Sequence, residues 1–284
     1  MKGDFCSTKT FASYFRQFGA VFGDEAHLFK AKSLTGIMTK LDTCKYRFGL
    51  TGTLDGTQTH RLVLEGLFGK AKYVVTTKEL IDNKTLSELS INCIILKYPD
   101  EDRQIVKEFD YGAELEYIVT KEERNLFLCN LVGHCNGNTL CLFQFVEKHG
   151  EPLYNIISNK YKDRKVFFVY GGVSTDTREE IREIVENETD AIIVASYGTF
   201  STGINIRNID NIVFASPSKS KIRVLQSLGR GLRLGDKSKS LKVFDISDDL
   251  SHASRLNFTL RHFHERLNIY KEQGFNYKID KVKL

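Results

Sequence analysis

The sequence has no long hydrophobic run, few prolines and no closely paired cysteines. No apolar stretch approaches the ~18 residues of a membrane span, and the first ten residues, MKGDFCSTKT, lack the apolar core of a signal peptide. The six cysteines include no CxxC pair. A disulfide or metal framework needs tighter, recurrent spacing, so we expect reduced and mostly buried thiols. These absences argue against a membrane partner and favour a cytoplasmic protein.

Length and charge suggest two domains with a basic second half. The 284 residues suffice for about two domains of ordinary size. The formal net charge is +5, but residues 97–124 hold nine acids and five bases, whereas residues 217–242 hold eight bases and one acid. Residues 253–284 hold seven bases and three acids. These basic segments could follow a phosphate backbone, or they could form a solvated surface.

Short apolar runs separated by helix-length polar segments predict an α/β fold with buried parallel strands and crossover helices. The expected strands are 20–23, 46–50, 72–75, 91–96, 139–143, 166–169, 191–195, 211–215 and 242–246. The expected helices are 33–41, 58–67, 122–133, 146–160, 175–187 and 220–233.

Domain boundaries follow from where this pattern weakens. The first part of the chain, residues 1–96, is expected to form one lobe. The acidic segment 97–121 has low apolar density and contains Pro99, so we expect it to join this lobe to a second lobe over 122–250. After residue 250 the strand pattern stops, and residues 251–284 place Leu, Phe and Tyr at helical spacing, which predicts a helical basic tail.

The first chemical signal is DEAH at residues 24–27, directly after an expected strand. Open α/β sheets bind ligands at the carboxyl ends of their strands. There, Asp24 could hold Mg²⁺ while Glu25 orients and deprotonates a water molecule. The structural alternative is a helix N-terminus, where acids are favourable in the first turn.

Two weaker signals also follow strands. Thr51-Gly52-Thr53 is a small, hydroxyl-rich turn after the strand at 46–50. The stretch 197–210 follows the strand at 191–195, and its hydroxyls and glycine predict a loop that offers N–H and O–H groups to phosphates. An ordinary Ser/Thr-rich connection is the alternative. The residues of that loop are Thr199, Ser201, Thr202, Gly203 and Asn205.

The sharpest signal is QSLGRGLR at 226–233. It places Arg230 and Arg233 three residues apart on one face of a helix or its last turn, with Gln226 on the same face. Guanidinium groups suit the charge of a transferring phosphoryl group. A helix that needed only solubility could use lysine.

In this order the motifs resemble those of superfamily 2 helicases and translocases of the DEAD/DEAH type, and within them the recombination helicases of bacteriophages. DEAH resembles motif II, residues 51–53 motif III, residues 199–205 motif V, and residues 226–233 the QxxGRxxR of motif VI. The resemblance covers nearly the whole chain. It implies two RecA-like lobes, the first truncated on its N-terminal side, with ATP between them, DNA across both and the host cytoplasm as location.

The resemblance also implies roles for individual residues. Catalysis would involve Asp24 on Mg²⁺, Glu25 on the attacking water, and Arg230 and Arg233 on the phosphates; an arginine finger of this kind contributes ~1000-fold or more in rate. The implied ATP contacts are Asp24, Glu25, His27, Gly203, Asn205, Gln226, Arg230 and Arg233. The implied coupling and DNA contacts are Thr51, Gly52, Thr53, Thr199, Ser201 and Thr202.

One expected motif is absent from the sequence. Helicases of this kind carry a phosphate-binding loop, GxxxxGK[ST], and no segment of the 284 residues fits it. Three explanations are open: a fragment of a longer product, half of a split helicase whose partner chain carries the loop, or a remnant that binds nucleic acid without hydrolysing ATP. The function predicted is an ATP-dependent DNA helicase, or its C-terminal portion, acting on branched DNA in recombination and repair. A non-catalytic binding module and an interaction protein for another helicase are the alternatives.

Overall fold

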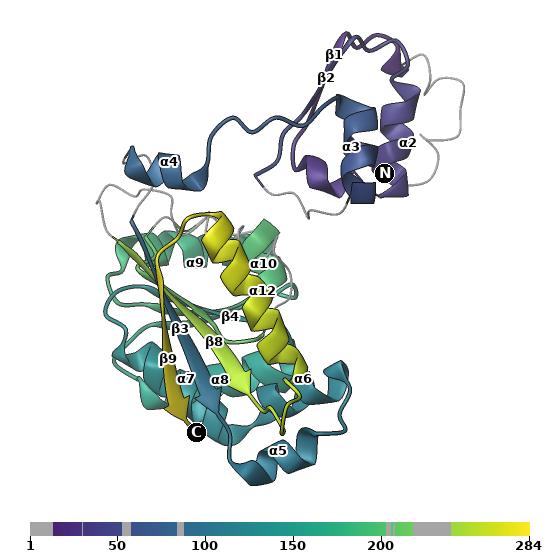
Figure 1. Ribbon diagram of the computed structural model, residues 1–284. Helices are drawn as coiled ribbons and strands as arrows, with labels where there is room; N and C mark the ends of the chain where they lie inside the picture. The colour runs from purple at the N-terminus through teal and green to yellow at the C-terminus, as the bar shows by residue number, and fades with distance from the viewer. Residues whose placement is uncertain are drawn as a thin grey trace. The chain divides into compact units, whose positions relative to one another are not determined.

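The structure is a computed structural model that describes residues 14–29, 31–52, 58–83, 88–202, 206, 208–217 and 240–284. The chain forms two compact units, Met1–Val74 and Val75–Leu284. Figure 1 shows the elements of each unit. The expected helix at 220–233 lies outside the described residues.

The first unit contains a two-stranded parallel sheet with helices on one face. Strands β1 (Ala20–Gly23) and β2 (Tyr46–Gly49) pair in register. The 3₁₀ turn η1 (Ala26–Leu28) follows β1, and the helices are α2 (Lys32–Lys40) and α3 (Gln58–Phe68). Their small core centres on Met38, Leu41, Cys44 and Leu67.

Two glycines allow the close packing of this unit. Gly23 and Gly49 are register partners at the ends of β1 and β2. A Cβ atom at Gly49 would lie 2.8 Å from Cγ of Phe68, and one at Gly23 would lie 2.9 Å from Cζ of the same ring. The ring of Phe68 therefore packs against the ends of both strands, in the space that a side chain at Gly23 or Gly49 would occupy.

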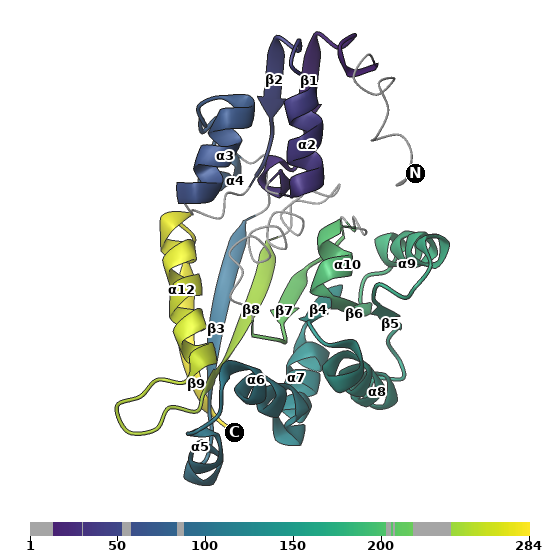
Figure 2. The same cartoon turned by 90° about the vertical axis from the view of Figure 1, so that its right-hand side faces the viewer.

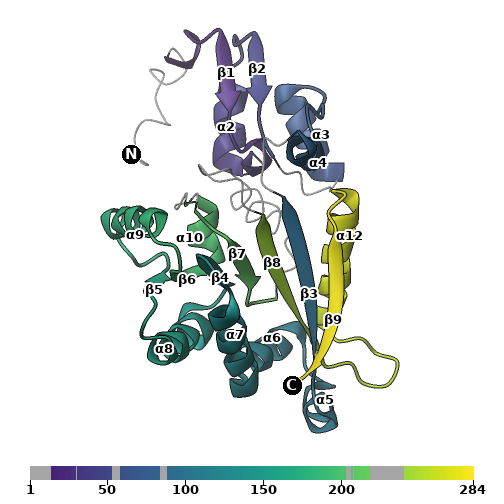
Figure 3. The ribbon, with the colours of Figure 1, turned by 90° about the vertical axis from the view of Figure 1, so that its left-hand side faces the viewer.

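The second unit is built on a parallel sheet of seven strands, ordered β5-β6-β4-β7-β8-β3-β9 (Figures 2 and 3). Its strands are β3 (Leu89–Lys97), β4 (Thr139–Phe143), β5 (Val166–Val169), β6 (Ile192–Ser196), β7 (Asn211–Phe214), β8 (Leu241–Asp249) and β9 (Tyr277–Lys283). Its helices are α4 (Thr77–Asp82), α5 (Asp100–Val106), α6 (Tyr111–Thr120), α7 (Glu122–His134), the π-helical turn η2 (Val146–Gly150), α8 (Glu151–Lys160), α9 (Thr175–Asn187), α10 (Tyr197–Thr202) and α12 (Phe258–Glu272).

Both faces of this sheet are covered, as parallel sheets require. Alternate strand residues pack against α9, α10 and α12 on one face and against helices α5 to α8 on the other. No described helix is both long and apolar enough to span a membrane.

Strand β8 carries a buried carboxylate on each face of the sheet. Asp245 accepts hydrogen bonds from Arg266 of α12, with the shortest N–O distance 2.7 Å. Asp248 accepts from Nε of Arg124 of α7 at 2.7 Å and from the Tyr98 hydroxyl at 2.9 Å. Buried charges are tolerated only when they are paired and hydrogen-bonded, so these two pairs fix both helices to one strand.

The α/β class and the parallel sheets are confirmed, but several boundaries differ. The expected strand at 72–75 is wrong: the segment runs without helix or strand, and Tyr73 and Val74 are 88% and 95% exposed. An apolar run without a partner strand or a core cannot persist as a strand. The expected strand at 91–96 exists as β3, but it belongs to the second unit, between β8 and β9.

Two predicted segments also have different structures. The acidic segment 97–121 is not an open join, because α5 and α6 within it pack on the second sheet. The tail contains the expected helix, α12, but its last residues form strand β9 at the sheet edge. This strand contains three lysines and an aspartate, and each of its residues is partly or fully exposed, which suits an edge strand.

Candidate functional site

The acidic turn after β1 has a strained backbone. Glu25 has φ 49° and ψ 49°, the left-handed region that non-glycine residues rarely occupy. This conformation costs on the order of 1–3 kcal/mol and is commonly found at functional sites. The backbone N–H of Glu25 donates to Oδ1 of Asp24 at 2.8 Å. Asp24 is exposed and Glu25 is half-exposed, so both carboxylates are accessible to a ligand.

His27 joins this turn to the end of the neighbouring strand. The side chain is buried, and its Nδ1 lies 2.9 Å from Oγ1 of Thr51 and 3.2 Å from Oε2 of Glu25. Backbone hydrogen bonds hold the same two segments: Ala26 N–H donates to Leu50 O at 2.8 Å, and Leu50 N–H donates to Gly23 O at 2.9 Å. The DEAH turn and the turn after β2 are therefore one structural unit.

The neighbours of His27 favour a proton on Nδ1. A lone pair on that nitrogen would face the Glu25 carboxylate at 3.2 Å, which is repulsive. An N–H there can donate to Glu25 and Thr51 together. The imidazole therefore contacts the Glu25 side chain and Thr51 with the same nitrogen, and the residue after Thr51, Gly52, is exposed.

Asp24 is suited to a magnesium ion that is mostly held by other ligands. The described residues contain no group of three His, Cys, Asp or Glu side chains that could hold a metal ion. Mg²⁺ commonly uses one or two protein carboxylates and takes its other oxygen ligands from water and phosphates. One accessible carboxylate at the end of a parallel strand fits this pattern.

In the second unit, the predicted hydroxyl-rich loop begins as a helix. Helix α10 follows β6 directly, so the loop prediction is wrong for residues 197–202. Ser196 acts as its cap: its hydroxyl accepts from the Thr199 N–H at 3.3 Å and donates to Thr199 Oγ1 at 2.8 Å. Thr199 is buried. Ser201 and Thr202 form the end of the helix.

Ser216, which sequence reasoning did not single out, connects three strand ends. Its hydroxyl accepts from the Gln144 N–H, after β4, at 3.0 Å and lies 2.9 Å from Nδ1 of His149 in η2. Its carbonyl accepts from the Tyr197 hydroxyl of α10 at 3.0 Å. Ser216 thus ties the ends of β4 and β7 to the start of α10. The sequence contained one signal for this position, because Ser216 is a polar residue that directly follows the apolar run at 211–215.

His149 is a neutral, buried histidine. Burial, with a contribution from the nearby Arg124, lowers the pKa of His149 to about 3. No described residue contacts its Nε2 by a hydrogen bond. It lies in a π-helical turn, a feature that often occurs at functional positions.

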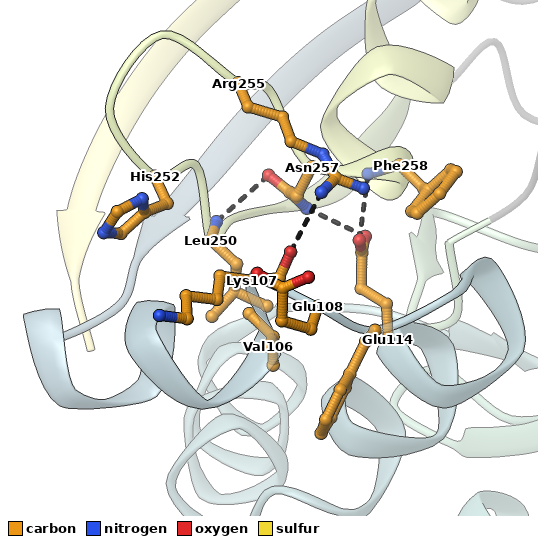
Figure 4. Close-up of a pocket in the computed structure, with 10 residues that line it drawn as sticks. Val106, Lys107, Glu108, Glu114, Leu250, His252, Arg255, Asn257 and Phe258 are labelled. Carbon is orange, nitrogen blue, oxygen red and sulfur yellow. Dashed lines mark hydrogen bonds between the residues drawn. The ribbon is translucent and has the colours of Figure 1, made fainter.

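A pocket of about 280 Å³ lies in the second unit, and none of the residues that line it is a predicted site residue (Figure 4). Glu114 of α6 forms part of its wall and holds the start of α12. Oε1 of Glu114 accepts from Asn257 Nδ2 at 2.9 Å and from the N–H and hydroxyl of Thr259 at 2.7 and 2.8 Å. Oε2 accepts from the Phe258 N–H at 2.9 Å. These contacts provide acceptors for the backbone N–H groups at the start of α12, so we interpret Glu114 as a structural residue of the pocket wall.

The structure brings together four predicted site residues: Asp24, Glu25, His27 and Thr51. Thr199 lies in the second unit, with its hydroxyl bonded to Ser196. The remaining predicted positions lie outside the described residues: Thr53, Gly203, Asn205, Gln226, Arg230 and Arg233. The five cysteines of the described part, Cys44, Cys93, Cys129, Cys135 and Cys141, are free and buried, as predicted.

Comparison with known proteins agrees with the motif order. Residues 123–235 match the helicase conserved C-terminal domain. The chain is also 35% identical to the ATP-dependent DNA helicase uvsW of Enterobacteria phage T4, over 95% of this chain and 56% of the T4 protein. The chain therefore spans about half the length of this relative.

Solved structures show the same similarity. The crystal structure of T4 UvsW matches with a TM-score of 0.60 at 34% identity, over 98% of this chain and 56% of that chain. The ATP-dependent Type ISP restriction-modification enzyme LlaBIII bound to DNA matches with a TM-score of 0.61 at 12% identity, over 94% of this chain and 22% of that chain. The second match shows a shared fold alone. The resemblance to superfamily 2 helicases and their RecA-like lobes is confirmed.

Proposed function

We propose that this chain forms the C-terminal portion of an ATP-dependent DNA helicase motor. The unit of residues 1–74 is the later part of the first RecA-like lobe, and the unit of residues 75–284 contains the second lobe. ATP lies between the lobes, and DNA crosses both. Branched recombination and repair intermediates are the substrate class, as in the bacteriophage helicases that the sequence resembles.

The observation that carries this proposal is the contact of His27 with both Glu25 and Thr51. In a motor, the groups that act on the nucleotide must be linked to other parts of the protein, so that hydrolysis changes the positions of those parts. Glu25 is the candidate general base, and the shared imidazole makes its position dependent on the turn at the end of β2. The strained backbone at Glu25 is maintained by this network and by the paired strands.

The chain's residues have distinct roles in the proposed reaction. Asp24 would hold Mg²⁺, which would neutralise phosphate charge when bound. Glu25 accepts a proton from the attacking water. Arg230 and Arg233 stabilise charge on the phosphates, and Gln226, Gly203 and Asn205 complete the nucleotide contacts from the second lobe.

Thr53, Thr199, Ser201 and Thr202 belong to the proposed coupling and DNA contacts, with Thr51 and Gly52. Thr199 acts by holding the start of α10, because its side chain is buried. Phosphate contacts position a nucleic acid without reading its bases, so the proposal specifies no sequence preference.

A nucleic-acid-binding module without catalysis is the second candidate. It is favoured by the lack of any GxxxxGK[ST] segment in the sequence, because that loop cradles the phosphates and supplies Lys and Ser/Thr. A separate chain that carries the loop reconciles this absence with the acidic turn.

One experiment separates the two candidates. DNA-stimulated ATP hydrolysis is measured for the chain alone and for the chain co-expressed with the part of T4 UvsW that lies outside the match. Hydrolysis that needs both polypeptides and is lost in Glu25→Gln and Arg233→Ala supports the motor. Absence of hydrolysis from the assembled complex, with salt-sensitive DNA binding retained, supports the binding module.

A further inference from the structure

Three neighbouring strands of the second sheet end at a shared polar junction. Their order is β6-β4-β7, and α/β sheets bind ligands at the carboxyl ends of such parallel strands (Figure 2). Tyr197 directly follows β6, Gln144 directly follows β4, and Ser216 lies two positions after β7. The Ser216 hydroxyl accepts from the Gln144 N–H, and the Ser216 carbonyl accepts from the Tyr197 hydroxyl, both at 3.0 Å. One serine therefore connects all three strand ends.

The Ser216 hydroxyl takes the place of a backbone acceptor beyond the last paired residues of β4 and β7. Leu142 and Phe214 are the last register partners, and the Ser216 N–H still donates to the Leu142 carbonyl at 3.3 Å. The next donor after β4, the Gln144 N–H, donates to the serine side chain instead of a carbonyl. Serine suits this position because its hydroxyl offers two acceptor lone pairs and one donor.

His149 orients the Ser216 hydroxyl. The His149 side chain is buried, and its Nδ1 lies 2.9 Å from the Ser216 Oγ. A serine proton that is donated to Nδ1 completes one chain of hydrogen bonds from Gln144 through Ser216 to His149. The other tautomer would leave the serine proton without an acceptor among the described residues. Nδ1 can accept only while the imidazole is neutral, which agrees with the lowered pKa of His149.

We propose that His149 and Ser216 are positioning residues for DNA binding, because together they fix the start of α10 against the end of β4. The inference rests on the proposed function, in which Ser201 and Thr202 at the end of α10 contact the nucleic acid. Helix α10 has only six residues, so its direction depends on what holds its first turn. Tyr197 begins that turn and donates to the Ser216 carbonyl. His149 and Ser216 act through α10 and are not themselves DNA contacts.

Four single variants separate positioning from a general loss of stability. Ser216→Ala removes the acceptor of the Gln144 N–H, and His149→Phe removes the acceptor of the serine proton. His149→Asn is the rescue variant, because an asparagine amide oxygen can lie close to the position of Nδ1. Ser247→Ala is the matched control, since Ser247 is a buried serine of β8 whose hydroxyl has no hydrogen-bond partner among the described residues. Thermal unfolding shows whether each variant is folded at the assay temperature.

Amide hydrogen exchange of the full 284-residue chain tests the positioning directly. Loss of one hydrogen bond should lower the protection of the Gln144 N–H and of α10 about fivefold to tenfold in Ser216→Ala and His149→Phe. His149→Asn and Ser247→Ala should keep the protection of the unmodified chain. Unchanged protection in Ser216→Ala or in His149→Phe overturns the inference.

DNA affinity tests the consequence for function. Fluorescence anisotropy with a single-stranded oligonucleotide is measured between ~50 and 200 mM salt. Loss of one phosphate contact of α10 should raise Kd about tenfold in Ser216→Ala and His149→Phe and reduce the salt slope by about 0.7. His149→Asn and Ser247→Ala should bind DNA like the unmodified chain.

Two results of the DNA assay overturn the inference. One is reduced protection of α10 with unchanged affinity and salt slope, and the other is an equal loss of affinity in Ser247→Ala. Failure of the proposed function has a different signature. An unmodified chain that binds no DNA contradicts the proposed function, whereas hydrogen exchange still decides whether His149 and Ser216 hold α10.

Discussion

Replacing Glu114 with glutamine tests how a single carboxylate organises the second unit. The side chain is buried and accepts four hydrogen bonds, three of them at Oε1 and one at Oε2. Its donors include two backbone N–H groups in the first turn of α12, a helix that also carries the buried Arg266. Glutamine is similar in shape but has no charge and presents an NH₂ group in place of one oxygen.

The cost follows from these contacts. Directing an NH₂ group at the Phe258 N–H leaves two buried donors facing each other, which costs about 1–3 kcal/mol. Removing the negative charge from the N-terminus of α12 costs a further ~1–2 kcal/mol in a buried setting. We expect Glu114→Gln to lower the free energy of unfolding by about 3 kcal/mol. For a unit of this size that corresponds to a fall in Tm of roughly 6–12 °C.

Glu116→Gln is the matched control on the same helix. Its partner is Lys148 at 2.7 Å, and both side chains are more than half exposed. Exposed ion pairs contribute little to stability, so the control should change the free energy of unfolding by less than ~0.5 kcal/mol. Urea denaturation followed by circular dichroism measures both. Equal effects for the two variants would show that Glu114 does not anchor α12.

Three further outcomes follow from buried titratable and charged groups. Burial lowers the pKa of His149 to about 3, whereas in the unfolded chain it is near 6.5, so as the pH falls the unfolded chain takes up the proton first. The native protein should therefore lose about 2 kcal/mol of stability from this group between pH 6.5 and 4.5, a loss absent in His149→Gln. Burial raises the pKa of Cys141 to about 12 and that of Cys135 to about 11, so iodoacetamide at pH 8 should label both only after denaturation, as peptide mass spectrometry can show. Arg124→Met should cost about 3–5 kcal/mol in urea denaturation, and adding Asp248→Asn should cost less than the sum of the single changes.

Two short apolar strands could be predicted well from the sequence. The runs at 139–143 and 166–169 have the bounds expected of them, the first buried at every position and the second partly buried at the sheet edge. A continuous apolar run suffices for such a prediction where the sheet is covered by helices on both faces. The same reasoning failed at 72–75, since a window of four apolar or β-prone residues carries no information about whether a partner strand exists.

Long-range contacts were beyond such reasoning. The bond from the Phe258 N–H to Glu114 spans 144 positions, and that between His149 and Ser216 spans 67. Neither pair belongs to a local motif. The acidic turn is similar in this respect: residues 24–27 and residue 51 were singled out separately from the sequence, and the His27–Thr51 contact, which spans 24 positions, was not predicted.

The position of β3 changes how the two units are connected. The chain leaves the first unit, passes the exposed residues Tyr73 and Val74, and then enters the sheet of the second unit between β8 and β9. Parallel ladders on both sides of β3 make it an interior strand of that sheet. The connection after the exposed residues and α4 is therefore held in the second unit by two parallel ladders at β3.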